Sequence, residues 1–395
     1  MRPAARDRTI DAARAIAICG VVVGHWLVTG LVPGPEGVTV ASPLTAMPAA
    51  APVSWLLQTL GLLFFAGGYA AHARGSAAGP AGGRRAGPLG RLLRPAAILL
   101  GAWALVLTAG AALGAPATTL RTIATLVVSP LWFLVPYLAL HAATAPLRRL
   151  VHRIGPAAVL PPLAVVAASD LGLLPGLAAL PAAWAIPWLL GMLVARHDRL
   201  ARAVTGRPGD DGAPHRGAGP WIGVALACNG AAALAVLILV AGYPAGAVGV
   251  PGDGRSNLDP PSLAAVALAV TQIGVLLTVR GPLARLLRHD RALRPVAALN
   301  RVAVPVYLGH QSVLLAVAGV AALVDPAMPG LLTAPDGAAW AGQRLAWLPV
   351  LGLVLAVVTR TRHDGGPDYL RRLLRGTLFD GSRARTTHGG DRCAR

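Results

Sequence analysis

Long apolar runs alternate along the chain with short polar segments that are rich in arginine. A membrane-spanning helix needs about 20 mostly apolar residues to cross roughly 30 Å of hydrocarbon. Ten runs have this character, of which the fifth contains Pro161 and Pro162 and the tenth is short. The pattern therefore predicts an all-α, polytopic membrane bundle of about ten helices, over residues 12–31, 53–73, 95–113, 123–143, 157–174, 178–195, 222–242, 263–279, 302–324 and 346–358.

Composition agrees with a membrane protein and excludes an ordinary soluble one. The chain has 395 residues, of which 55% are hydrophobic and only 13% are charged, whereas about a quarter of the residues of a soluble domain are charged. All 35 residues counted as Lys or Arg are arginine, and the formal net charge is +19. Such a balance is typical either of nucleic-acid binding or of a membrane protein oriented by its loops.

The positions of the arginines favour the second explanation. When the predicted spans are threaded with the N-terminus in the cytoplasm, 32 arginines lie on the cytoplasmic side and only Arg121, Arg255 and Arg344 lie outside. A wrong span count would invert every later loop, so this asymmetry supports the topology. We expect both termini in the cytoplasm, a multi-pass protein of the plasma membrane surrounded by lipid, and no nucleic-acid partner.

One membrane domain accounts for most of the chain. We expect it to cover residues 1–375, with an uncleaved first span and a flexible linker at residues 205–220. Residues 376–395 contain almost no apolar side chains and predict a disordered cytoplasmic tail. The three cysteines, Cys19, Cys228 and Cys393, have neither the number nor the spacing of a disulfide framework or a metal site.

The first span carries ionisable residues inside an apolar helix. Arg14 and His25 are eleven residues apart, which places them on one helix face about 16 Å from each other, and Asp11 can pair with Arg14. Intramembrane charges are costly and usually line functional interiors. His25 is therefore a candidate general base and Arg14 a candidate anion ligand. The structural alternative is an interfacial Arg14 and a His25 that is bonded to a neighbouring helix.

Three further segments contain candidate polar or aromatic groups. Arg91 and Arg94 precede Pro95 at a predicted helix start, where free amides favour anions, although basic residues belong on this side in any case. Trp132 and Tyr137 flank Pro136 in the fourth span, and Tyr307 and His310 lie on adjacent turns of the ninth. Gly67 and Gly68 predict close helix packing. An outer loop with Arg255, Asn257 and Asp259 is a candidate acceptor surface.

Taken in order, these motifs resemble acyltransferase family 3, the integral-membrane acyltransferases that modify sugars, envelope glycans and macrolides. The resemblance rests on the Arg14 to His25 spacing, the Arg91 and Arg94 pair, LWFL at 131–134, WLLGMLVARH at 188–197 and VYLGHQ at 306–311. It covers about residues 11–360. The sequence departs from the family pattern in FFAGGY, at Gly67 and Tyr69.

The resemblance implies transfer of an acyl group from cytoplasmic acyl-CoA, with acetyl-CoA one candidate, to a hydroxyl of a glycan or small molecule. No cofactor is expected to be bound permanently, and no metal. His25 would be the catalytic base, Arg14, Arg91 and Arg94 would hold the donor, and Trp132, Tyr307 and His310 would contact substrate. We prefer His25 to His310 as the base because of its depth. His25 lies about thirteen residues, or 20 Å, into its span, whereas His310 lies only about eight residues into its own. The competing hypothesis is a transporter or flippase of a polar or lipid-linked compound.

Overall fold

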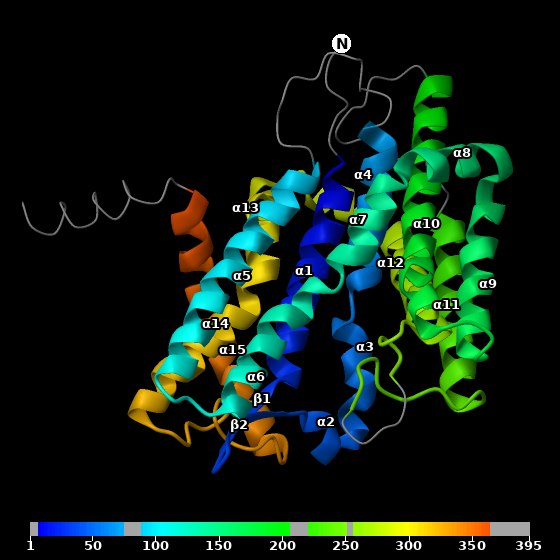
Figure 1. The fold of residues 1–395 in the computed structure, drawn as a ribbon. Helices are drawn as coiled ribbons and strands as arrows, with labels where there is room; N and C mark the ends of the chain where they lie inside the picture. The colour runs from blue at the N-terminus through cyan, green and yellow to red at the C-terminus, as the bar shows by residue number, and fades with distance from the viewer. Residues whose placement is uncertain (1–6, 75–87, 206–219, 251–255, 364–395) are drawn as a thin grey trace, which may run out of the picture.

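The computed structural model describes residues 7–74, 88–205, 220–250 and 256–363 (Figure 1). Within these residues, ten segments are long and apolar enough to cross a membrane. The predicted all-α polytopic bundle is therefore confirmed, and its spans follow the predicted order. The predicted tail at 376–395 and the central part of the predicted linker lie outside the described residues.

Most of the first half of the bundle consists of helices that are interrupted by short 3₁₀ turns. In chain order the elements are α1 (Arg8–Val28), β1 (Gly30–Gly34), β2 (Gly37–Ala41), α2 (Pro43–Ala46), α3 (Ser54–Leu57), α4 (Leu60–Arg74), α5 (Pro88–Ala112), α6 (Ala117–Val128), α7 (Leu134–Ala142), α8 (Thr144–Ile154) and α9 (Leu160–Asp170). The 3₁₀ turns are η1 (Pro48–Val53), η2 (Ser129–Leu131) and η3 (Gly155–Val159). The fourth span is thus broken at η2, just before Trp132.

The second half contains longer helices. They are α10 (Gly176–Thr205), α11 (Pro220–Leu239), α12 (Leu263–Leu286), α13 (Asp290–Arg301), α14 (Ala303–Val324) and α15 (Ala338–His363). Helix α13 has no buried residue and carries Arg291, Arg294 and Arg301. Its polar and apolar residues separate onto two faces, which is typical of a helix that lies along a membrane interface.

Helix α1 forms the centre of the bundle. Figure 1 shows it in dark blue between α5 and α14 on one side and α4, α10 and α12 on the other. It contacts α4, α12, α13, α14 and α15. The Asp7 carboxylate caps its first turn by accepting hydrogen bonds from the amides of Thr9 (2.9 Å) and Ile10 (3.4 Å). Because α1 is one unbroken helix, Arg14 and His25 share a face as expected.

Small residues let α4 and α10 pack against each other at very short range. A Cβ atom added at Gly67 would lie 2.6 Å from the Trp188 ring, and one added at Gly68 or Gly191 would overlap a backbone carbonyl oxygen of the facing helix. The prediction that the two glycines of FFAGGY serve helix packing is confirmed. This packing buries Phe64, Phe65 and Trp188 completely.

Several predicted boundaries were wrong. The first span ends at Val28, and the apolar residues after it form the antiparallel hairpin β1–β2, in which Gly34 pairs with Gly37. Gly37 has a φ of 117°, which favours glycine. The last helix starts at Ala338, eight residues before the predicted start. Pro161 and Pro162 lie inside the fifth span, Thr144–Asp170, as predicted, and occupy the first turn of α9 within it, where proline is tolerated.

Candidate active site

Two histidines from distant parts of the chain meet in the middle of the bundle. His25 lies in the last turn of α1 and His310 lies in α14. The Nδ1 atom of His25 is 2.9 Å from the Nε2 atom of His310. The ring centroids are 4.9 Å apart, and His310 is completely buried. The structure thus joins the two intramembrane histidines that the sequence singled out.

The partners of His310 determine which nitrogen carries each proton. The Nδ1 atom of His310 is 2.6 Å from the backbone carbonyl oxygen of Tyr307. A carbonyl oxygen only accepts, so His310 Nδ1 must carry the hydrogen, and in the neutral ring Nε2 is then an acceptor. His25 Nδ1–H therefore donates to His310 Nε2. The remaining nitrogen, His25 Nε2, carries no hydrogen and is free to act as a base.

This contact corrects the argument from depth. His310 follows the start of α14 by seven residues and His25 follows the start of α1 by seventeen, yet the two rings touch. Asn300, just before α14, donates to the carbonyl oxygen of Asp11 in the first turn of α1 at 2.7 Å. The Trp26 indole N–H also donates to the His310 carbonyl oxygen at 3.0 Å. Depth therefore does not distinguish the two histidines, whereas their hydrogen bonds do.

A pocket of about 360 Å³ lies between α1, α4, α7 and α14, and we call it the central pocket. Arg14 and Arg301 line it together with the aromatic residues Phe133, Tyr137 and Tyr307. The Tyr307 ring packs on Phe133 with centroids 4.2 Å apart and meets the His310 ring edge-on at 5.9 Å. Neither His25 nor His310 lines the pocket, and Tyr307 is the lining residue whose ring contacts the histidine pair.

Of the predicted donor ligands whose side chains are described, Arg14 lies at the central pocket and Arg94 lies away from it. Arg14 lines the central pocket and lies 4.0 Å from Asp11, which confirms the expected pairing. Arg94 is exposed on α5 and does not line the pocket. Arg91 belongs to the same helix, but its side chain lies outside the described residues.

Trp132 is displaced from the central pocket. Its ring is half-buried and packs near Trp184 of α10, with centroids 6.1 Å apart. The next residues, Phe133 and Leu134, line the pocket in its place.

A buried ion cluster joins four residues that lie far apart in the sequence. Arg280 of α12 contacts the carboxylates of Asp7 and Asp198 at 2.6 Å each, and the Tyr69 hydroxyl donates to Asp198 at 3.0 Å. The cluster joins α1, α4, α10 and α12. It gives Tyr69, one of the two departures from the family pattern, a packing role, which the sequence alone could not show because the partners lie far apart in it.

Two residues expected at the outer surface are buried. Arg344 lies inside α15, is completely buried, donates to the Thr29 carbonyl oxygen at 2.5 Å and lies over the Trp340 ring. Asn257 is also completely buried and donates to the carbonyl oxygens of Pro244 and Gly246 at 2.8 Å each. Asn257 therefore shapes the loop and cannot be part of an exposed acceptor surface. Arg255 lies outside the described residues.

Ten apolar segments around a histidine pair, beside a pocket that contains arginine, define a multi-pass membrane protein with a candidate acid–base site. The family model described as an acyltransferase domain, that of acyltransferase family 3, matches residues 7–359, and the chain belongs to this family. Comparisons with curated proteins and with solved structures gave no match. Membership supports membrane acyltransferase activity in general.

Proposed function

We propose that this protein moves an acyl group from acyl-CoA to a hydroxyl group of a sugar, an envelope glycan or a macrolide-like acceptor. The observation that carries the proposal is the hydrogen-bonded series from the Tyr307 carbonyl oxygen through His310 to His25. It leaves His25 Nε2 as a basic nitrogen that a neighbouring histidine holds in place. The same logic applies in serine hydrolases, where a buried partner fixes the tautomer of the histidine base.

The central pocket is the proposed donor site. Its volume of about 360 Å³ lies within the usual range for small-molecule pockets. Arg14 provides a guanidinium group for the phosphates of CoA, and Arg301 lines the same space. The thioester would then lie towards Tyr307, near the histidine pair. Arg91 and Arg94 remain proposed ligands for the part of CoA outside the pocket. Acyl-CoA is consumed as a substrate, so no permanently bound cofactor is needed.

The proposed reaction needs one base and no covalent enzyme intermediate. His25 Nε2 takes the proton of the acceptor hydroxyl while its oxygen attacks the thioester carbonyl carbon. A carbon–oxygen bond forms, the carbon–sulfur bond breaks, and the departing CoA sulfur takes the proton from His25. The products are an ester and CoA thiol. His310 is a positioning residue in this scheme, since it keeps the His25 ring in the required tautomer.

The arginine asymmetry supports a cytoplasmic location for the N-terminal end of α1. Acyl-CoA would then enter from the cytoplasm at Arg14. The end of α1 that carries His25 would face the outer half of the membrane, where an envelope acceptor is presented. This arrangement favours the plasma membrane.

The proposal is tested by mass spectrometry of envelope glycans and secreted metabolites from a deletion strain. We expect one compound from the deletion strain to lack the mass of an acyl group. Expression of the wild-type protein should restore this acylated compound, and expression of a His25→Ala variant should not. A matched control is His289→Ala, which changes an exposed histidine at the start of α13. If the deletion instead changes the distribution of an unmodified compound across the membrane, the transporter hypothesis is favoured.

A further inference from the structure

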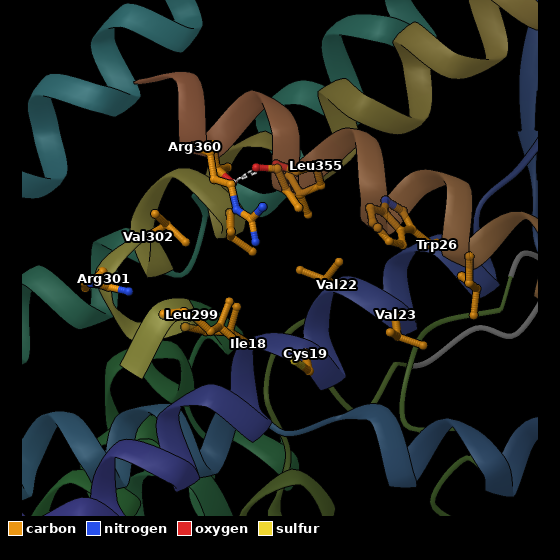
Figure 2. Close-up of a pocket in the computed structure, with 16 residues that line it drawn as sticks. Ile18, Cys19, Val22, Val23, Trp26, Leu299, Arg301, Val302, Leu355 and Arg360 are labelled. Atoms are coloured by element: carbon orange, nitrogen blue, oxygen red, sulfur yellow. Dashed lines mark hydrogen bonds between the residues drawn. The ribbon is translucent and has the colours of Figure 1, made fainter. Parts of the chain in front are cut away.

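A second cavity, of about 610 Å³, lies between α1, α14 and α15 and is bounded at one end by α13. We call it the lateral groove. Figure 2 shows Val22, Val23 and Trp26 of α1 on one side and Leu355 of α15 on the other. Neither His25 nor His310 lines it. It shares Ile18 and Arg301 with the central pocket, which neither histidine lines either, and differs from that pocket in its α15 wall.

The charges of the lateral groove lie together at one end. Arg301 and Arg360 are both exposed, and Figure 2 shows them away from Trp26, at the far side of the cavity. None of its described lining residues is acidic. Thr359 uses its hydroxyl within its own helix, donating to the Leu355 carbonyl oxygen at 2.8 Å. The lateral groove is thus apolar along its length and cationic at its mouth.

Its length matches one leaflet of a bilayer. The lining residues of α15 run from Leu348 to Arg360, and the twelve helical steps between them rise about 18 Å. Half of the hydrocarbon core of a bilayer is about 15 Å. Arg360 would lie near the headgroups when Leu348 lies near the midplane.

The wall of the lateral groove is open where α15 carries a glycine. A Cβ atom added at Gly352 would have no neighbouring atom within 4 Å, so the space beside this residue is unfilled by protein. Cys19 is exposed to the same cavity, although it belongs to the central helix. A hydrocarbon chain would fill this space and join α15 to α1.

We propose that the lateral groove binds one acyl chain of an anionic phospholipid, with its phosphate held by Arg301 and Arg360. Moving the acyl chain from the bilayer into the lateral groove contributes little binding free energy, because the surrounding lipid is equally apolar. Selectivity comes from the headgroup, since guanidinium groups bind phosphate through paired, charge-assisted hydrogen bonds. The lipid belongs to the leaflet at the N-terminal end of α1. Arg301 also lines the proposed donor site, whereas Arg360 and Gly352 line the lateral groove and not the central pocket, so substitutions at these two residues test the lipid site separately from the proposed reaction.

Native mass spectrometry of the full-length protein tests this, with phosphatidylglycerol and phosphatidylcholine of identical chains as the probes. We expect one phosphatidylglycerol to be retained on the order of tenfold better than phosphatidylcholine. Arg360→Gln should reduce this preference severalfold, because Arg360 lines the lateral groove and not the central pocket. The matched control, Arg291→Gln, changes an exposed arginine of α13 that lines neither cavity.

A second pair of variants tests the apolar part. Gly352→Leu should fill the lateral groove and abolish the specific lipid adduct, whereas Gly342→Leu, on the same helix and also without neighbours, should leave it. Equal retention of both lipids, or equal behaviour of the two leucine variants, would overturn the proposal. Displacement of phosphatidylglycerol by glycerol phosphate would show a headgroup site without a chain. Displacement of phosphatidylglycerol only by a long-chain acyl-CoA would show that the cavity is a donor site. Either displacement result would refute a lipid site.

Discussion

Two ring nitrogens decide what the histidine pair can do. The sequence indicated that His25 and His310 both lie in apolar helices, but it could not show that they touch. Their contact depends on how far α14 is shifted along α1, and this shift is set by tertiary contacts such as Asn300 with the Asp11 carbonyl oxygen. The choice of His25 as the base therefore rests on the tautomer imposed by the Tyr307 carbonyl oxygen.

Substitution of His310 should slow transfer without preventing donor binding. In His310→Ala the His25 ring loses the acceptor that fixes its tautomer, and we expect the rate to fall about ten- to a hundredfold, as for other orienting partners of functional histidines. His310→Gln should recover part of the rate, because its side-chain oxygen can still accept from His25. The measurement is the turnover rate together with the acyl-CoA dissociation constant. A parental rate for His310→Ala would refute the positioning role.

Substitution of Arg14 should weaken donor binding. A hydrogen bond to a charged group contributes about 1.5–3 kcal/mol, so Arg14→Ala should raise the acyl-CoA dissociation constant about ten- to a hundredfold. Lysine at this position should recover only part of the affinity for acyl-CoA, because an ammonium group lacks the planar guanidinium that forms paired hydrogen bonds with phosphate. Titration calorimetry checks this, with Arg153→Ala, an exposed arginine of α8, as the control. Unchanged affinity would exclude Arg14 from the donor site.

The same titration applies to the double variant Arg91→Ala/Arg94→Ala, which we expect to bind acyl-CoA more weakly. The exposed position of Arg94 makes this a contact with the outer part of the donor. If the double variant retains full affinity while Arg14→Ala does not, the donor is held by the central pocket alone.

At the scale of elements, apolar run length was sufficient to predict the spans, and local backbone chemistry decided their ends. Leu31 and Val32 extend the apolar run of the first span, yet Gly30, Pro33 and Gly34 turn the chain into a hairpin. The start of α15 was missed because polar Gln343 and Arg344 interrupt the apolar pattern. Arg344 is nevertheless inside the bundle, where its guanidinium group donates to the Thr29 carbonyl oxygen and lies over the Trp340 ring.

The contact between α4 and α10 should not tolerate a methyl group. In Gly191→Ala the new Cβ would overlap the Phe65 carbonyl oxygen and lie 2.7 Å from the Tyr69 nitrogen, both of which are backbone atoms that cannot move aside. We expect a loss of about 1–3 kcal/mol of stability. Gly101→Ala is the control, since its Cβ meets nothing within 4 Å and alanine favours a helix.

Thermal unfolding of both variants in the same detergent measures this difference. Gly191→Ala should unfold at a lower temperature than the parent, and Gly101→Ala at the same or a higher temperature. Equal unfolding temperatures for the two variants would show that the helices separate easily and that their close contact is not required.

For the whole molecule, the distribution of charge predicts the orientation. In the predicted threading most arginines gather on the cytoplasmic side, and of the three predicted outside, Arg121 lies within α6 and Arg344 within α15. Reporter fusions after Arg202 and after Arg375 should both report cytoplasm, and a fusion near Asp253 should report the outside. A fusion after Arg375 that reports the outside would overturn the topology and the proposed entry side of acyl-CoA.

We propose His25 as the base that activates the acceptor hydroxyl. The most direct test compares His25→Ala with the parent in purified, membrane-reconstituted form, measuring acyl transfer and acyl-CoA binding on the same preparation. A positioned base contributes about a hundred- to ten-thousand-fold, so transfer should fall by at least a hundredfold while donor affinity changes little. A stable, correctly inserted His25→Ala protein that transfers acyl groups at near-parental rates would contradict the account.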